Sequence, residues 1–534
     1  MDLKILKIRK YLWMSTLLSA LLLAGCAYTY TAENKDGLPE DREGNEAVQG
    51  LGLTPEFDYE VPLSLPGILV NQTGYAPLAK KIAVFRGSKM PNNFEVVNEE
   101  TGEIVFAGEV EDKGFNKVSG EYNSYGIFDG LTEPGNYYIQ ASVLGRSYSF
   151  TIEEEIYSDA FHLACRKYYF NRCGITLVEE LAGEAAHSAC HTKASLLEED
   201  HNVQMDMSGG WHMDENYSKN VVKGSQVMAN LLLAYELYPE AFLDESGIPE
   251  SGNDVPDILD EVKYEADWML KMQDSVTGGV YSETVVRDRS IPSYARQEVY
   301  IRPVTLEATA SFAAVMAKFS YIYQAYDTAY ATECLRAADR AWRFMENIRG
   351  GQEVEQRFFA AAELYRATGY RSYRFAAEEY LSAGIWKELS NDYIFWGCTT
   401  YISTKQNVDI NICSSIMQKL MEDAEEISEK SRKARYLTFG NQEQDNNDEL
   451  LHQMMRLTVV DHIIANHEYE TIIENHIHYF MGRNAKAISY IDGTGENNYA
   501  DIDVKLGIMN RFDLNAELIF MMSEVISWHR TLSK

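Results

Sequence analysis

The sequence is short of basic residues. Its 534 residues include 48 lysines and arginines against 81 aspartates and glutamates, which gives a formal net charge of −33 at pH 7. Contacts to nucleic acid phosphates require basic surface, so this balance argues against nucleic acid as a partner. It also disfavours broad attraction to anionic lipid, whereas neutral polymers such as glycans are not excluded by charge.

The N-terminus lacks the length of a transmembrane helix. Basic residues precede an apolar stretch from Leu12 to Leu23, which is too short to span a bilayer comfortably, so residues 1–26 are interpreted as a signal peptide. The stretch ends in Leu23-Ala24-Gly25-Cys26, which resembles a bacterial lipobox. We therefore expect an extracytoplasmic, membrane-anchored lipoprotein at the bacterial cell surface, held by an acyl chain on Cys26. The alternative is an ordinary secretory signal with an incidental cysteine.

Two composition changes divide the rest of the chain. Residues 27–62 are acidic, rich in Gly, Asn and Pro and without hydrophobic periodicity, so they are predicted to be a disordered tether. Residues 63–155 contain short alternating segments broken by turns. Roughly seven strands in about 85 residues are typical of an immunoglobulin-like β-sandwich.

Residues 156–534 change to a helical pattern. Apolar side chains recur at i, i+3, i+4 and i+7, and clusters of Gly, Pro, Asn and Asp separate the segments. The clearest predicted helices are Val222–Leu237, Ile258–Met272, Thr305–Tyr326, Thr328–Met345 and Glu355–Thr368. An all-helical region of this size suggests a toroid of paired helices.

Cysteines are few, with six after Cys26. An even number in an exported protein suggests disulfides. However, two of them combine with two histidines in the order Cys173, Cys190, His191, His212. Two thiolates and two imidazoles form the closed tetrahedral set of a structural zinc site, so we predict zinc here. The alternative is a Cys173–Cys190 disulfide beside two unrelated histidines.

One segment indicates function more specifically than the amino-acid composition does. Residues Asp206–Tyr217 read DMSGGWHMDENY, with Lys219 two residues on, and this resembles the segment that carries the catalytic base in glycoside hydrolase family 9, the inverting cellulase-type enzymes. Further matches to that family are Ile248–Asn253, Val255–Glu261, Trp268–Gln273, Gly278–Tyr281, Ala362–Gly369 and Tyr479–Asn484. The resemblance implies an immunoglobulin-like module before an (α/α)6 barrel, endoglucanase-type hydrolysis of β-1,4-glucan, and zinc ligands in this order. It leaves calcium sites open.

The sequence lacks carboxylates where this resemblance implies catalysis. The two base aspartates of the family fall on Met213 and Asn216, and its acid falls on Met509. Neither a thioether nor an amide can act as a base. Asp214 and Glu215 are the remaining catalytic candidates, and they could serve only if an irregular loop returned one of them to the water.

Two further features bear on the acid and on the sugar. Glu517 lies eight residues beyond Met509, which is about two turns along a helix, so it should not reach the same oxygen. Between Gly495 and the final helix the sequence also lacks the His-His-Arg run that, by resemblance, grips the sugar.

Three functions stay open on the sequence. The first is a surface-anchored, glycan-binding relative that has lost or strongly reduced its hydrolysis of β-1,4-glucan. The second is an active inverting endo-β-glucanase with carboxylates relocated to Asp214 or Glu215, and the third is a structural or interaction protein with no glycan ligand. Aromatic residues exposed along the cleft would favour the first, and the candidates are Trp211, Tyr217, Tyr281, Trp396 and Phe439.

Overall fold

The computed structural model describes residues 66–117, 120–214, 216–286, 297–346, 348, 353–439, 446–465, 467–501 and 506–532. The predicted signal peptide with Cys26 and the predicted tether lie outside these ranges, so the lipid anchor stays a prediction. Within the described ranges, no helix is both long enough and apolar enough to cross a bilayer.

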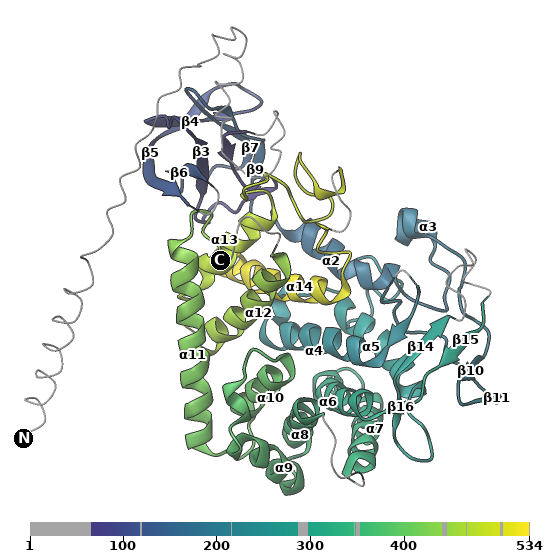
Figure 1. The fold of residues 1–534 in the computed structure, drawn as a ribbon. Helices are drawn as coiled ribbons and strands as arrows, with labels where there is room; N and C mark the ends of the chain where they lie inside the picture. The colour runs from purple at the N-terminus through teal and green to yellow at the C-terminus, as the bar shows by residue number, and fades with distance from the viewer. Residues whose placement is uncertain are drawn as a thin grey trace, which may run out of the picture. The chain divides into compact units, whose positions relative to one another are not determined.

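The first part of the described chain is an immunoglobulin-like β-sandwich, as predicted (Figure 1). Its strands follow the order β1-β3-β6-β5-β4-β7-β9-β2, with β8 on β7. The bounds are β1 Ile68–Leu69, β2 Gly74–Tyr75, β3 Ile82–Gly87, β4 Asn93–Asn98, β5 Ile104–Asn116, β6 Glu121–Ile127, β7 Gly135–Ala141, β8 Gly145–Arg146 and β9 Phe150–Ile152.

The long strand β5 belongs to both sheets of the sandwich. Its residues up to Glu109 pair with β4, and its residues from Val110 pair with β6, with a register shift between Asp112 and Gly114. A strand that changes sheet in this way makes a corner of a sandwich. The inward-facing aromatic side chains Tyr75, Phe85, Phe94 and Phe150 fill the core between the sheets.

The second part contains alternating outer and inner helices, which form an (α/α)6 barrel. The outer helices are α2 Ser158–Phe170, α5 Asp257–Lys271, α7 Thr328–Glu346, α9 Arg371–Ser382, α11 Ile410–Lys433 and α13 Glu470–Phe480. The inner helices are α4 Val221–Leu237, α6 Leu306–Tyr323, α8 Val354–Thr368, α10 Asp392–Ser403, α12 Asn447–Ile464 and α14 Phe512–Leu532. A short helix, α3, spans Glu179–Ala182.

The sequence explains this alternation. Outer helices such as α7 carry one apolar face, which is the pattern of a helix with one side in water. Inner helices such as α6 are buried on almost every side and are correspondingly apolar all round. Neighbouring inner helices contact one another in order: α4 contacts α6, α6 contacts α8, and α8 contacts α10. On its other side α4 contacts α14, which contacts α12.

Besides the predicted helices, this region contains two small β-sheets that the helical pattern did not predict. A five-stranded sheet has the order β11-β10-β15-β14-β12, and β13 pairs with β16. The bounds are β10 Ser195–Leu197, β11 Asp200–Met205, β12 Lys219–Asn220, β13 Val280–Tyr281, β14 Glu283–Val286, β15 Val299–Ile301 and β16 Val304–Thr305. The parallel pair Leu196↔Tyr300 joins segments about a hundred residues apart. Such pairing depends on tertiary context, which local periodicity does not report.

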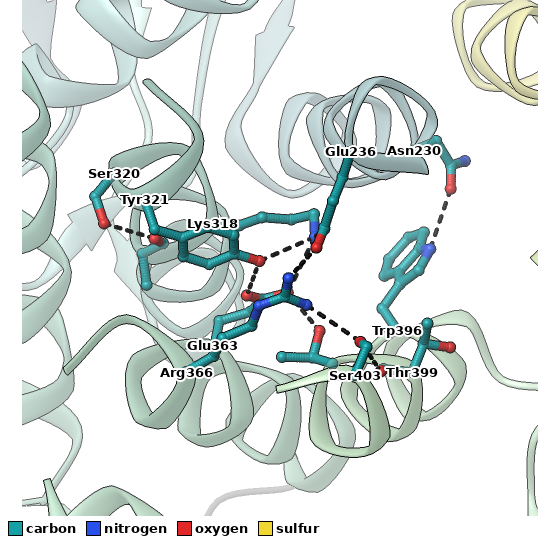
Figure 2. A network of polar contacts seen from close by, with 12 residues as sticks. Asn230, Glu236, Lys318, Ser320, Tyr321, Glu363, Arg366, Trp396, Thr399 and Ser403 are labelled. Atoms are coloured by element: carbon teal, nitrogen blue, oxygen red, sulfur yellow. Dashed lines mark hydrogen bonds and ion pairs between the residues drawn. The ribbon is translucent and has the colours of Figure 1, made fainter. Parts of the chain in front are cut away.

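The C-terminal turns of four inner helices are tied together by a buried charge network (Figure 2). Lys318 Nζ on α6 lies 2.7 Å from Glu236 Oε2 on α4 and 3.6 Å from Glu363 Oε1 on α8. Arg366 on α8 also pairs with Glu236 and donates to Ser403 on α10. Because all four helices contribute residues from their C-terminal halves, they run parallel, and this network closes one end of the barrel. We call it the closed end.

Candidate functional site

The segment predicted to carry the base is folded as a tightly bonded loop before α4. Asp206 Oδ1 accepts hydrogen bonds from the backbone N–H and the hydroxyl of Ser208, and its Oδ2 lies 3.0 Å from Lys271 Nζ. The bonds from Ser208 and the nearby ammonium lower the pKa of Asp206 to about 2. Buried Lys219 donates to the carbonyls of Met207 and Gly209. Asp206 and Lys219, which flank the segment, therefore stabilise the fold of this loop.

Asp214 is exposed, and its carboxylate is hydrogen-bonded to its own loop. Its Oδ1 accepts from the backbone N–H groups of Asn216 at 2.8 Å and Ser218 at 3.1 Å, and its Oδ2 accepts from Ser218 Oγ at 2.5 Å. Burial raises the pKa of Asp214, but the hydrogen bonds from Ser218 and Asn216 outweigh it and leave the pKa below its usual value. Glu215 lies outside the described residues.

The loop is irregular and not a helical turn. Met213 N–H bonds to Ser218 O, Tyr217 N–H bonds to Asp214 O, and Tyr217 has a left-handed φ of 58°. The irregular loop was the condition under which Asp214 could have reached a catalytic water. The loop meets that condition, yet its own donors occupy both carboxylate oxygens.

Of the three positions implied by resemblance, Met213 and Met509 are apolar and packed, and Asn216 is a half-buried amide. The Met213 methyl group lies against Gly224 in the first turn of α4. Met509 is 2% exposed and lies in a turn before α14 begins at Phe512. The comparison of Met509 and Glu517 along one helix was therefore wrong, because only Glu517 is on α14.

The four predicted metal ligands come together. Their ligand atoms all lie within 4.8 Å of one another, and all four residues are buried. Sγ of Cys173 and Sγ of Cys190 are 3.9 Å apart and unbonded, which excludes the disulfide alternative. Cys173 Sγ to His191 Nδ1 and Cys190 Sγ to His212 Nε2 are both 3.6 Å, and the two histidine nitrogens are 3.3 Å apart.

The surroundings of this Cys-His cluster also suit a metal. Gly174 N–H donates to Cys190 Sγ at 3.5 Å, and the backbone of His212 is fixed by a bond to Asn171 O. A hydrogen bond between the two thiols lowers the pKa of Cys173 well below its usual value and raises the pKa of Cys190. Elsewhere in the described ranges no other group of three or more such side chains converges, so calcium stays an untested prediction.

A pocket of about 250 Å³ opens at the end of the barrel opposite the closed end. We call it the mouth pocket. It is lined by the N-terminal halves of α4, α10, α12 and α14 and by Arg511 just before α14. The lining residues are Gln226, Asn230, Asp392, Trp396, Asp448, Glu449, His452, Arg511, Asp513, Leu514 and Glu517. Met213 packs against the first turn of α4 and Met509 lies three residues before α14, so both positions belong to this end.

His452 links two carboxylates in the mouth pocket. Its Nδ1 lies 3.3 Å from Glu517 Oε1, and its Nε2 lies 3.3 Å from Asp392 Oδ1. Burial lowers the pKa of His452, but Glu517 and Asp392 outweigh it and raise the pKa overall. Burial raises the pKa of Glu517 despite His452. The imidazole occupies the space between the two carboxylates.

The predicted aromatic residues are mostly core. Trp211, Tyr281, Trp396 and Phe439 are buried, and Tyr217 is half-buried. Of these, Trp396 lines the mouth pocket, and its Nε1 donates to Asn230 Oδ1 at 3.1 Å (Figure 2). The sequence reasoning missed His452 and Asp392. A polar residue in the apolar run of α12 was the available signal, but the sequence alone does not tell which helices are inner.

Comparison with known proteins agrees with this geometry. The model of glycosyl hydrolase family 9 matches residues 157–503, and that of the cellulase N-terminal Ig-like domain matches residues 64–146. The chain belongs to glycosyl hydrolase family 9. A metagenome-derived family 9 endoglucanase structure has a TM-score of 0.77 and 26% identity, and the match covers 86% of this chain and 99% of that one.

Two curated family 9 relatives are similar along most of their length. A cellodextrinase of Butyrivibrio fibrisolvens is 29% identical over 484 residues, which is 81% of this chain and 85% of the relative. Endoglucanase D of Acetivibrio thermocellus is 28% identical over 512 residues, which is 90% of this chain and 76% of the relative. This chain is thus a cellulase-like member of the family.

Proposed function

We propose that this protein binds β-1,4-glucan-type polysaccharide at the mouth pocket and has lost, or strongly reduced, the hydrolysis typical of its family. The observation that carries the proposal is the engagement of Asp214. Both of its oxygens accept hydrogen bonds from its own loop, and the neighbouring Met213 and Asn216 offer no base. Inverting hydrolysis needs one carboxylate for the water and one acid for the leaving oxygen.

The mouth pocket supports binding over a purely structural role. It stays open to about 250 Å³, and it combines the wall of Trp396 and Leu514 with amides and carboxylates. A few convergent polar groups in a concave site are the usual make-up of a ligand site. The side chains of Asn230 and Gln226 are suited to sugar hydroxyls, which donate and accept hydrogen bonds.

We further propose that the Cys-His cluster holds a structural zinc ion. Tetrahedral zinc with its usual bond lengths places two sulfurs about 3.8 Å apart, sulfur and nitrogen about 3.6 Å apart, and two nitrogens about 3.4 Å apart. The observed separations of 3.9, 3.6 and 3.3 Å fit these values. Four protein ligands would leave no open position for a substrate, so the ion would fix the loop before α4.

The location is part of the same proposal. A lipid-modified Cys26 and the acidic tether of residues 27–62 would hold the domains outside the cytoplasmic membrane, where polysaccharide is found. The test of function is affinity electrophoresis in gels containing soluble β-glucan, combined with an assay of reducing-end release. Retardation without release is expected. Release at a rate typical of the family, or a lack of retardation, would overturn the proposal.

A further inference from the structure

The charges that line the mouth pocket are not balanced. Its walls carry five carboxylates, from Asp392, Asp448, Glu449, Asp513 and Glu517, against the cations of Arg511 and His452. Arg511 is already paired with Asp448 and Asp513, and His452 with Asp392 and Glu517. Arg456, which does not line the pocket, also pairs with Asp392, and even with this third cation the carboxylates remain in excess. The pocket therefore presents an excess of negative charge to whatever occupies it.

One acceptor in this pocket has no partner within the described residues. Glu517 is 93% buried, and while its Oε1 contacts His452, its Oε2 is buried without any hydrogen bond. A buried carboxylate oxygen left unpaired is costly, because its solvation by water is lost. Within the described part of the chain, His452 and Arg456 offset part of the cost of burying this carboxylate, and a donor on a ligand would offset more of it.

We infer that the mouth pocket selects an amino sugar, with the protonated amine of a β-1,4-linked glucosamine residue donating to Oε2 of Glu517. A neutral hydroxyl could donate one hydrogen bond there. An ammonium donates up to three and also supplies the missing positive charge. This inference rests on the proposed glycan-binding function and names its ligand class.

The remaining walls fit a pyranose ring. Trp396 and Leu514 form an apolar wall, as sugar C–H faces require, and Gln226 and Asn230 offer amides to the hydroxyls. The amine adds only one charged contact to a ligand that otherwise has the shape of a cello-oligosaccharide. The selectivity should therefore reside in Glu517 and not in the shape of the pocket.

The test compares two trisaccharides that differ only at C2, where the glucosamine trimer carries an amine on each of its three residues. Binding of cellotriose and of the β-1,4-linked glucosamine trimer to the whole protein is measured by isothermal titration calorimetry, below the pKa of the amine. We expect the glucosamine trimer to bind about tenfold more tightly, since a hydrogen bond to a charged group is stronger than one between neutral groups. This preference should shrink at high salt, because ions screen charge pairs.

Two variants locate the preference. Glu517→Gln should reduce the preference for the amine to less than about threefold, because it removes the charge and half of the acceptor capacity. Asp448→Asn removes one charge from the same pocket, but this carboxylate is exposed and paired with Arg511, so the preference should persist. Thermal unfolding of each variant shows whether it is folded.

The outcomes separate the two proposals. A preference for the glucosamine trimer that Glu517→Gln abolishes supports the inference. Binding of cellotriose with no preference for the amine overturns the inference and leaves the proposed function standing. A preference that survives in Glu517→Gln also overturns it, and binding of neither trisaccharide overturns both.

Discussion

The two ends of the barrel treat their buried charges differently. At the closed end, two carboxylates face two cations, and Glu363 also accepts from Tyr321 and Thr400 (Figure 2). At the mouth, carboxylates outnumber cations and one oxygen of Glu517 stays unpaired among the described residues. A network whose members are all satisfied rigidifies a core, whereas an unsatisfied member indicates another purpose. The closed end is built for stability, and the mouth keeps groups for a ligand.

The largest effect should come from the metal. Removing the metal with a chelator, or replacing Cys190 by Ser, should lower the midpoint of thermal unfolding by about 10 °C, since structural metal sites contribute several kcal/mol to folding. Hydrogen exchange should accelerate in the loop before α4 and stay slow at the closed end. If hydrogen exchange accelerated equally at both ends, the proposed difference in stability between the two ends would be wrong.

The metal experiment has a matched control. Cys413 is a buried free thiol outside the Cys-His cluster. Cys413→Ser should therefore keep its metal content, measured by elemental analysis of the purified protein, while Cys190→Ser loses it.

The same substitution, Glu to Gln, should change the free energy of unfolding by different amounts at the two ends. Glu363→Gln should lower the free energy of unfolding by about 3 kcal/mol, because it leaves buried Lys318 with one fewer partner. Glu517→Gln should change it by less than about 1 kcal/mol, because the change replaces a poorly paired carboxylate. Denaturant unfolding of the two variants measures both values. A loss of similar size for both would mean that Glu517 is a stabilising core residue.

A smaller effect should depend on pH. The pKa of His452 is raised above its ordinary value of 6.5, so its protonation favours the folded state. The contribution is complete below about pH 6.5 and is lost as the pH rises through the higher pKa of the folded state. Asp392, Glu517 and Arg456 are the charged groups that face the imidazole.

This contribution is measurable against His452→Gln, which cannot titrate. The wild-type protein should exceed the variant in unfolding free energy by about 1 kcal/mol at pH 6, and the difference should narrow toward pH 9. A difference that grows with pH would contradict the stabilising contacts of protonated His452 with Asp392 and Glu517.

The sequence predicted those features that depend on local pattern or on ordered motifs. The five clearest helices lie within three residues of their observed ends, as Val222–Leu237 and α4 illustrate. The four ligands of the Cys-His cluster were found from residue type and order. The sheet from β10 to β15 was missed, because its pairing is non-local. The contacts of Asp214 could not be predicted either, since they depend on the path of one loop.

The mouth pocket shows the same limit. The sequence offers Glu517 only as a substitute for the acid, and no motif in it indicates His452. Their importance arises from the meeting of α12 and α14 with α10, which no single segment contains. Trp211, one of the five candidate cleft aromatics, packs against Tyr168 and Phe512 in the core.

The most direct test of the central claim is the release of reducing ends from soluble mixed-linkage β-glucan by the wild-type protein and by Asp214→Ala, over a long incubation. Because Asp214 is bonded to its own loop, we predict no release above the buffer control from either protein, together with retained binding of the glucan. Release by the wild type that disappears in Asp214→Ala would show that the base has moved by one residue, and that this chain is a working glycosidase.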